Sequence, residues 1–263
     1  MIICDGVTKV YGDATVVDDV RLIIHTGGVT SIIGPNGAGK STLLSMMARL
    51  IGMDGGRVSV DGHDVSAIAS DVLARRLAIL RQDNHIDIRL TVRDLVTFGR
   101  YPHTKGRPTI EDRVHVERAL DYMDMDHLAG RFLDELSGGQ RQRAFVAMTL
   151  AQDTEYILLD EPLNNLDMPH AVAMMKVVKR AAKELGKTVV VVIHDINFAS
   201  AYSDRIVAMR DGSVVAQGTP EEIVTTEVMR DVYGLDMQVM EHDGHRFAMY
   251  FGAEHVWTGT GDR

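Results

Sequence analysis

One stretch near the start of the chain combines closely spaced glycines with a lysine and two hydroxyl residues. It reads GPNGAGKST, runs from Gly34 to Thr42, and satisfies the spacing G-x-x-x-x-G-K-[ST]. A short β-branched run, TSIIG, precedes it, and an amphipathic segment that extends to about Leu50 follows it. Glycines let a backbone wrap closely around anionic oxygens, and the N–H groups at a helix start carry positive potential. The pattern predicts a phosphate-binding loop between a strand and a helix.

A loop of this kind predicts ATP and Mg²⁺ as ligands. Lys40 is expected to reach the β- and γ-phosphates, Ser41 to ligate Mg²⁺, and Thr42 to donate a hydrogen bond to the α-phosphate. A glycine-rich turn with a chance lysine is the simpler alternative, and the flanking strand and helix disfavour it. The predicted nucleotide contacts in the loop are Gly34, Pro35, Asn36, Gly37, Ala38, Gly39, Lys40, Ser41 and Thr42.

A second chemical pattern is the pair of acids that ends the apolar run YILLDE. A buried strand that ends at Asp160 directs a carboxylate to the edge of a sheet where ligands bind in α/β proteins, so Asp160 is predicted to ligate Mg²⁺. Glu161 follows directly and is predicted to activate the attacking water as a general base. Two solvated acids at a strand end are common, and the upstream lysine loop favours the catalytic interpretation.

The stretch DELSGGQRQR, Asp134 to Arg143, holds a second pair of glycines, which follows Ser137. Its exposed N–H groups suit an anion, so the chain has two glycine-rich segments of similar chemistry. A helix that begins after an N-capping Ser137 would produce the same pattern, and this interpretation is compatible with anion binding.

The remaining patterns predict an α/β fold. Strands dominate the first third, helical patterns dominate from about Asn84 to Leu136 with Thr91 and Thr109 as N-caps, and α/β alternation then returns. Asp-Gly turns at 211–212 and 243–244 predict hairpins. We expect a P-loop NTPase core with a mainly parallel sheet, an N-terminal antiparallel β subdomain and an inserted α-helical subdomain. The expected bounds are 1–83 and 152–233 for the core, 84–151 for the helical subdomain and 234–263 for a C-terminal hairpin.

Composition limits the classes of function. The 263 residues are 45% hydrophobic and 25% charged, as in an ordinary globular protein, and the net charge of −9 disfavours non-specific nucleic-acid binding. A single cysteine, Cys4, excludes an internal disulfide. The start MIICDG lacks the features of a signal peptide, and the apolar runs are too short to span a bilayer. A cytosolic protein is expected, and any membrane role requires a partner.

Six motifs follow one another along the chain, and their order is informative. They are GPNGAGKST, Gln82 in LRQDN, LSGGQ, YILLDEP, Asp167 in LNNLD, and His194 in VVIHD. Together they resemble the ATP-binding cassette ATPases, and the resemblance extends from Tyr11 to about Gly218. It implies that Tyr11 stacks on adenine, Gln82 contacts Mg²⁺ and water, and His194 contacts the γ-phosphate. The implied catalytic residues are Glu161, His194, Lys40 and Gln82, and the implied metal ligands are Ser41, Gln82 and Asp160.

The resemblance also implies why there are two glycine-rich segments. Cassette ATPases pair head to tail, so that each ATP lies between the phosphate loop of one copy and the Ser-Gly-Gly segment of the other. The residues implied to contact the partner copy's nucleotide are Ser137, Gly138, Gly139 and Gln140. Asp167 is implied to lie at the dimer interface, although Asn164-Asn165 stand where many relatives have Ser-Ala.

The segment TVRDLVTFGRYPHTKG narrows the resemblance, because GRYPH is similar to a segment of metal-chelate importers. LDEPLNNLDM is similar to the ferric-siderophore branch. A peripheral protein on the cytoplasmic side of the membrane is therefore implied. Its implied partners are a second copy of itself, two permease subunits that dock near Asn84–His103, and a substrate-binding protein that acts on the permease, with no nucleic acid. The alternatives are an importer of haem, cobalamin, zinc or amino acids, an exporter, or a cassette protein that works outside transport.

Overall fold

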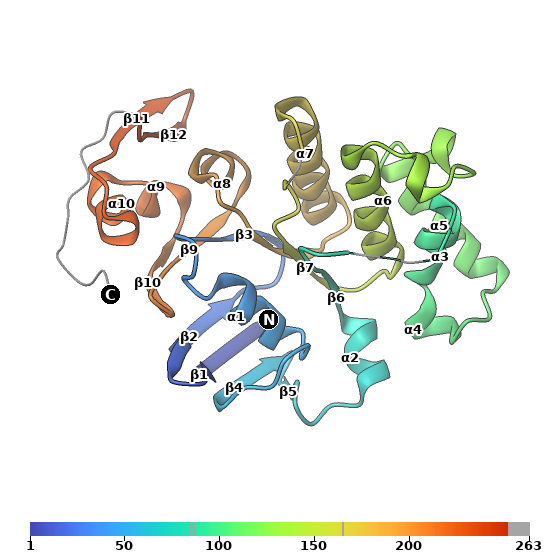
Figure 1. The fold of residues 1–263 in the computed structure, drawn as a ribbon, viewed down its shortest axis with the longest axis horizontal. Coiled ribbons are helices and arrows are strands. Elements are labelled where there is room, and N and C mark those ends of the chain that lie inside the picture. The colour runs from blue at the N-terminus through green and yellow to red at the C-terminus, as the bar shows by residue number, and fades with distance from the viewer. Residues whose placement is uncertain (85, 87, 165, 252–263) are drawn as a thin grey trace. The chain divides into compact units, whose positions relative to one another are not determined.

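The computed structural model describes residues 1–84, 86, 88–164 and 166–251 (Figure 1). The chain divides into two compact units. Unit 1 comprises Met1–His25, Val29–Ser66 and the described part of Val192–Arg263. Unit 2 comprises Thr26–Gly28 and Ala67–Val191. In the part of the chain that the structure describes, no helix is both long and apolar enough to cross a bilayer.

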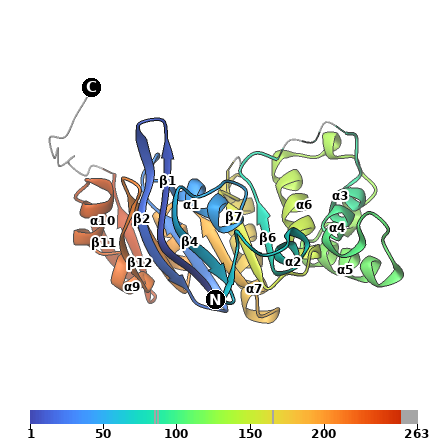
Figure 2. The same cartoon turned by 90° about the horizontal axis from the view of Figure 1, so that it is seen from below.

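An antiparallel sheet forms one side of unit 1. Its strand order is β2 (Ala14–Ile24), β1 (Ile2–Tyr11), β4 (Gly55–Val60) and β5 (His63–Asp64). Along β2, exposed positions alternate with the buried Val20, Leu22 and Ile24, as the period of a half-buried strand requires. Helix α1 (Lys40–Met47) packs against this sheet (Figure 2). The predicted N-terminal antiparallel subdomain is therefore present.

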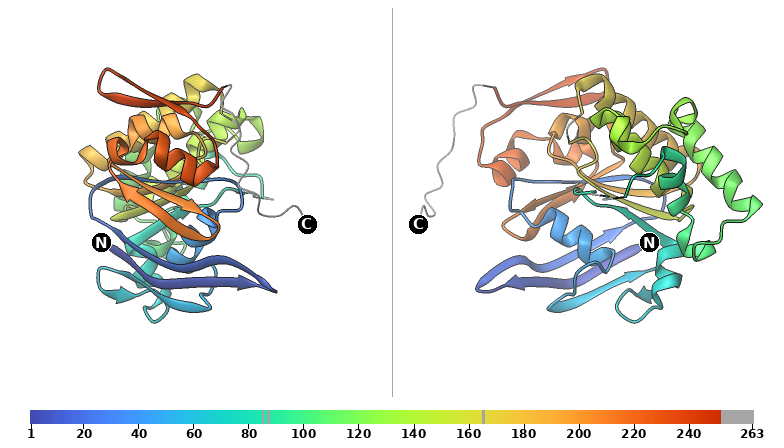
Figure 3. Two further views of the ribbon diagram at one scale, coloured as in Figure 1. Left: turned by 90° about the vertical axis from the view of Figure 1, so that its left-hand side faces the viewer. Right: turned by 45° about the vertical axis from the view of Figure 1, so that its right-hand side comes forward.

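The rest of unit 1 is built on parallel and hairpin strands. β3 (Gly28–Ile33) runs parallel to β9 (Arg205–Arg210), which forms an antiparallel hairpin with β10 (Ser213–Gly218). Helices α8 (Ile196–Tyr202), α9 (Pro220–Ile223) and α10 (Thr226–Tyr233) follow in the chain, together with the hairpin of β11 (Gln238–His242) and β12 (His245–Met249). This hairpin lies on the opposite side of unit 1 from the antiparallel sheet (Figure 3). Both hairpins that the Asp-Gly turns predict are confirmed.

Unit 2 combines strands with most of the helices. β6 (Leu77–Leu80) runs parallel to β7 (Tyr156–Asp160), and β8 (Thr188–Val192) is the next strand beyond β7. Helix α2 (Ser70–Arg76) precedes β6 in the sequence, and α7 (Met168–Glu184) lies between β7 and β8. The helices α3 (Val92–Phe98), α5 (Ile110–Tyr122) and α6 (Gly138–Ala151) pack together, with the short α4 (Tyr101–Thr104) and two 3₁₀ turns, Asp126–Leu128 and Leu133–Glu135. The antiparallel N-terminal sheet, the mainly parallel strands and this helical group confirm the predicted fold class.

Side-chain caps start the helices α3, α5 and α6 of unit 2. The Thr91, Thr109 and Ser137 hydroxyls each accept a hydrogen bond from the backbone N–H three residues ahead, and the side chain at that position accepts in return from the cap's own N–H. All three caps agree with the sequence. The helical pattern from Thr91 to Tyr101 does not form one helix, because it divides at Gly99–Arg100 into α3 and α4.

Candidate functional site

The glycine–lysine loop joins β3 to α1 in unit 1, where the sequence predicts it. Gly34 has φ 145°, and a Cβ atom added there would lie 2.1 Å from the Met209 carbonyl oxygen. Gly39 has φ 89°, and its Cβ would lie 2.5 Å from the Val16 carbonyl oxygen. Both positions exclude a side chain through backbone contacts and through φ. The loop therefore keeps its path only with glycine at these two positions.

The Lys40 side chain is buried against this loop. Its Nζ atom donates to the carbonyl oxygens of Gly34 at 2.9 Å and Pro35 at 2.8 Å, and the residue is 5% exposed. Asn36 and Gly37, at the outer side of the loop, are exposed. A buried ammonium group that lies against this loop supplies the positive charge that the sequence predicts for a phosphate-binding lysine.

The parallel pairing of β6 and β7 brings three polar side chains of unit 2 together. Leu80 is the register partner of Leu159, so Gln82 and Asp160–Glu161 follow the carboxyl ends of neighbouring strands. The Gln82 Nε2 atom donates to Glu161 Oε2 at 2.8 Å. Ligands bind at this edge of parallel sheets. The structure thus places the predicted base beside the predicted glutamine.

Glu161 is constrained on several sides. It is 9% exposed and has φ 50°, a left-handed conformation that non-glycine residues rarely adopt. The Asn164 side-chain amide donates to the same oxygen, Glu161 Oε2, that accepts from Gln82. Asp160, which is 6% exposed, ends β7 directly before it. Unusual backbone conformations that persist at such positions are frequent in catalytic sites.

The second glycine-rich segment begins α6, also in unit 2. Ser137 Oγ accepts from the Gln140 N–H at 3.3 Å, and Gln140 Oε1 accepts from the Ser137 N–H at 3.0 Å. Ser137 and Gly138 are exposed. A Cβ at Gly139 would lie 3.4 Å from side-chain atoms of Leu166 and His170, so this segment packs against the start of α7. The cap and the anion-binding interpretation remain compatible, as the sequence predicts.

Asp167 caps α7. Its Oδ1 atom accepts from the His170 N–H at 3.2 Å and contacts the His170 imidazole. Two hydrogen bonds lower the pKa of Asp167. The bond with the His170 imidazole has the larger effect, and the bond from the His170 N–H has the smaller one. Asn164, three residues before Asp167, donates to Glu161, and Asn165 lies outside the described residues. Asp167 is exposed, as a residue predicted to face a second copy requires.

The two remaining predicted contacts lie in unit 1. Tyr11 ends β1 and is 51% exposed, with Lys9 Nζ 5.2 Å from its ring centroid. An exposed ring is available for stacking. His194 is also exposed and stands between β8 and α8, directly before the helix-capping Asp195. The roles of Tyr11 and His194 stay predictions.

Comparison with known proteins decides the family, since a sequence profile described as "ABC transporter" matches residues 17–164. The chain belongs to the ABC transporter family. It is 53% identical to the petrobactin import ATP-binding protein YclP of Bacillus subtilis, over 94% of this chain and 98% of that protein. It is 50% identical to the petrobactin import ATP-binding protein FatE of Bacillus anthracis, over 95% of this chain and all of that protein.

A solved structure of a dimeric bacterial ABC transporter cassette agrees with this result. It superimposes with a TM-score of 0.75 at 32% identity, and the match covers 84% of this chain and 99% of that one. The chain is therefore an ATP-binding, ATP-hydrolysing ABC ATPase, as its ordered motifs predict.

The predicted Mg²⁺ ligands of this ABC ATPase are Ser41, Asp160 and Gln82, which offer a hydroxyl, a carboxylate and an amide oxygen. Mg²⁺ prefers such oxygen ligands, and it is usually held by one or two protein carboxylates together with phosphate oxygens and water. Within the described ranges, no group of three or more His, Cys, Asp and Glu side chains is suited to hold a metal ion. The donor set fits an ion that binds together with a nucleotide.

The GRYPH segment of this ABC ATPase has a structural function that the sequence does not reveal. A Cβ at Gly99 would lie 2.1 Å from the Met148 carbonyl oxygen, so α3 approaches α6 closely. The buried Arg100 donates from Nε to Asp112 Oδ1 at 2.9 Å and from Nη1 to the Ala151 carbonyl at 2.9 Å. His103 Nε2 contacts the Gln152 carbonyl at 2.9 Å. These contacts fasten α3 and α4 to α5 and α6, while the Tyr101 side chain stays 59% exposed.

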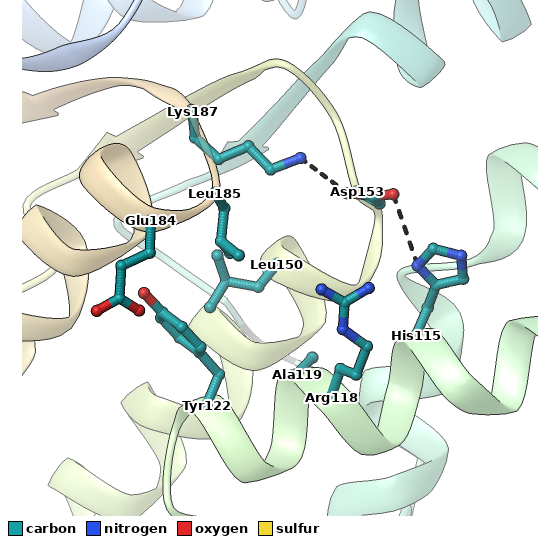
Figure 4. Close-up of a pocket in the computed structure, with 9 residues that line it drawn as sticks. All are labelled: His115, Arg118, Ala119, Tyr122, Leu150, Asp153, Glu184, Leu185 and Lys187. Atoms are coloured by element: carbon teal, nitrogen blue, oxygen red, sulfur yellow. Dashed lines mark hydrogen bonds and ion pairs between the residues drawn. The ribbon is translucent and has the colours of Figure 1, made fainter.

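Unit 2 also has a cavity of about 310 Å³ between α5, the end of α6 and the end of α7 (Figure 4). Lys187 Nζ pairs with Asp153 Oδ1 at 2.7 Å on one side of it, and the Asp153 carboxylate also faces His115 at 3.6 Å. The lining residues are His115, Arg118, Ala119, Tyr122, Leu150, Asp153, Glu184, Leu185 and Lys187. The lining contains none of the predicted nucleotide contacts.

Proposed function

We propose that this ABC ATPase powers a bacterial importer of ferric siderophores. The observation that carries the proposal is the 53% identity to a petrobactin import ATP-binding protein, over nearly the full length of both chains. The GRYPH and LDEPLNNLDM segments support the same branch of the family. The protein would work as a peripheral subunit on the cytoplasmic side of the membrane.

The proposed chemistry assigns a separate task to each group. Glu161 accepts a proton from the water that attacks the γ-phosphate, and Gln82, which donates to Glu161 at 2.8 Å, keeps that carboxylate in place. Lys40 and the loop N–H groups stabilise charge on the phosphate oxygens, and His194 orients the attacking water. Ser41, Asp160 and Gln82 would hold Mg²⁺, whose charge neutralises the phosphates.

The proposed working unit is a head-to-tail dimer. Ser137–Gln140 of one copy would contact the γ-phosphate held by the phosphate loop of the other, and Asp167 would lie at the interface. Ser137 and Gly138 are exposed at a helix N-terminus, where an anion is favoured. ATP binding would close the dimer, and loss of the γ-phosphate would weaken it.

The proposed permease site is the groove of unit 2 that is lined by α3, α4 and the loop after α4. It encloses about 280 Å³, and its lining residues are Leu90, Asp94, Thr97, Phe98, Tyr101, Thr104, Gly106 and Pro108. Phe98 is 50% and Tyr101 59% exposed, so aromatic surface is available to an apolar helix of the permease. The groove overlaps the predicted docking range Asn84–His103, in which His85 and Asp87 lie outside the described residues.

The proposed domain bounds remain 1–83 and 152–233 for the core, 84–151 for the helical subdomain and 234–263 for the C-terminal part. The hairpin β11–β12 supports a distinct C-terminal element. A substrate-binding protein would deliver the chelate to the permease.

A growth experiment tests the proposed substrate class. A strain without this gene should fail to grow when a ferric siderophore is its only iron source, and the wild-type gene should restore growth. The Glu161→Gln gene should not restore it. Unchanged siderophore-dependent growth, with a defect confined to haem, cobalamin or zinc, would replace the proposed substrate by that one.

A further inference from the structure

The edge of the C-terminal hairpin is completed by a side chain of α8. Asn197 Oδ1 accepts from the Ala248 N–H at 2.8 Å, and Asn197 Nδ2 donates to the Ala248 carbonyl at 3.4 Å. One amide thus makes both bonds that a neighbouring strand would make with Ala248. Strand edges left without such partners expose unpaired backbone groups. Asn197 therefore joins α8 to β12.

A second side chain of α8, one helical turn later, also bonds to the backbone of β12. Ser200 Oγ donates to the Arg246 carbonyl at 2.7 Å, and Ser200 is 4% exposed. Residues three apart on a helix share a face, so Asn197 and Ser200 both point toward β12. Arg246 in turn donates from Nη1 to the Glu221 carbonyl at 2.6 Å. The hairpin is held along its edge by specific bonds.

The helix that the hairpin holds begins at Ile196, two residues after His194. Asp195 Oδ1 accepts from the N–H groups of Asn197 at 2.8 Å and Phe198 at 3.0 Å, which fixes the first turn of α8. Asn197 thus takes part in the cap through its backbone and in the hairpin contact through its side chain. Only the capping Asp195 stands between His194 and the first turn of α8.

Packing ties the same hairpin to the phosphate loop. Ala248 is 2% exposed and belongs to one buried cluster with Ile33 and Ile196. Ile33 directly precedes Gly34, and Ile196 is the first residue of α8. Such contacts transmit a displacement because protein interiors are closely packed.

Tyr233, at the end of α10, packs against this cluster as well. Its hydroxyl is buried and makes no hydrogen bond of good geometry to any described residue. Burial raises the pKa of Tyr233, the Gly34 backbone partly offsets this, and the charge of Asp195 adds to it. The C-terminal part of the chain thus reaches both segments that are predicted to face the phosphates.

We propose that Asn197 is a positioning residue for ATP hydrolysis, which holds His194 in place by joining α8 to the C-terminal hairpin. The proposal rests on the role of His194 in the proposed function. The proposal also gives the β11–β12 hairpin a role in hydrolysis, although the hairpin contains none of the nucleotide-binding motifs. A hairpin that only stabilises the fold would change the melting temperature when loosened, but not the rate of the chemical step.

Asn197→Ala in the full-length chain tests the proposal, with Thr226→Ala as its matched control. Thr226 Oγ1 donates to the Met237 carbonyl at 3.1 Å. Its loss therefore removes a contact between α10 and the residue before the hairpin, and it leaves the contacts of α8 in place. We expect Asn197→Ala to lower kcat about tenfold with KM for ATP changed less than about twofold, because a small misplacement of a catalytic group is costly. Thr226→Ala should keep kcat within about twofold of wild type.

Two further measurements accompany the kinetics. They are the melting temperature of each variant and the amide hydrogen exchange of its segment 193–203. Exchange should be faster in Asn197→Ala and unchanged in Thr226→Ala. If Asn197→Ala does not fold, Ser200→Ala replaces it and should show a smaller loss of kcat in the same direction. Equal kcat losses in the α8 variant and the control, or no loss in either, would overturn the proposal.

His194→Ala separates failure of this inference from failure of the proposed function. If His194→Ala keeps wild-type turnover, the role of His194 in the proposed function is wrong. If it lowers turnover, adding Asn197→Ala should reduce the residual rate by less than about twofold, because both changes then act through one group. A further tenfold loss in the double variant would show that Asn197 acts independently of His194.

Discussion

Gln82 donates a hydrogen bond to Glu161 across the carboxyl ends of two parallel strands. This contact joins the residue predicted to touch Mg²⁺ and water to the residue predicted to be the base. Gln82 also lies shortly before the segment Asn84–His103 that we propose as the permease docking range. A displacement of Gln82 by the permease would therefore change the surroundings of the Glu161 carboxylate.

Glu161→Gln should preserve ATP binding and lower turnover by about 10²- to 10⁴-fold, because the amide cannot accept the proton of the attacking water. With ATP, this variant should accumulate as a dimer, visible by size-exclusion chromatography. Asn164→Ala is the matched control, because it removes one amide donor to Glu161 and leaves the carboxylate in place, so its effect should be smaller. Wild-type turnover in Glu161→Gln would exclude Glu161 as the base.

The shared nucleotide site predicts that two different defects complement each other in trans. A heterodimer of a Lys40→Ala chain and a Ser137→Arg chain has one site with both defects and one intact site. Purified through two affinity tags, it should trap ATP at about half the wild-type stoichiometry, since only one site remains. Each variant alone should trap none.

The same two substitutions placed in one chain provide the control for this experiment. Paired with a wild-type chain, the doubly substituted chain leaves one defect in each shared site, so this heterodimer should trap no ATP. Equal trapping by the two heterodimers would contradict the arrangement in trans.

Part of this architecture is predictable from sequence for local reasons. Thr91, Thr109 and Ser137 each precede a helix with an acid or glutamine three residues later, and each forms the reciprocal cap that this spacing indicates. The Asp-Gly pairs form their hairpins because both turn positions accept positive φ.

The unpredicted elements are short or depend on distant contacts. Helices α9 and α10 are not among the predicted elements. Thr219 and Glu222 carry the capping signal of α9, but that helix has only four residues. The contact of Gln82 with Glu161 depends on strand register, which no local pattern contains. Arg100 and Asp112 are charged residues of the kind usually found at the surface, and the packing of α3, α5 and α6 against one another buries them.

The proposed permease groove predicts that binding and ATP hydrolysis can be separated. Phe98→Asp introduces a charge into the groove and should abolish co-purification with the permease, because an apolar helix cannot solvate it. ATPase activity of the isolated protein should stay within about twofold of wild type, because Phe98 is not one of the residues predicted to contact the nucleotide. Val114→Asp is the control, because Val114 is similarly exposed at 55% and does not line the groove. Permease binding by Phe98→Asp would place the docking surface elsewhere.

The buried pair of Arg100 and Asp112 predicts how stability depends on pH. Burial alone would raise the pKa of Asp112, but the hydrogen bonds from Thr109 and Arg100 outweigh it and lower the pKa to about 2. Because the folded pKa lies below the unfolded value of about 3.9, the carboxylate stabilises the fold above about pH 4, and this contribution is lost as the pH falls toward 2.

Urea unfolding at pH 7 should show Asp112→Asn to be about 3 kcal/mol less stable, with the difference shrinking below pH 4. Asp94 makes the same cap on α3 but is exposed, so Asp94→Asn should cost about 1 kcal/mol or less. An Asp112→Asn difference that stays constant down to pH 2.5 would show that the charge of Asp112 does not stabilise this packing.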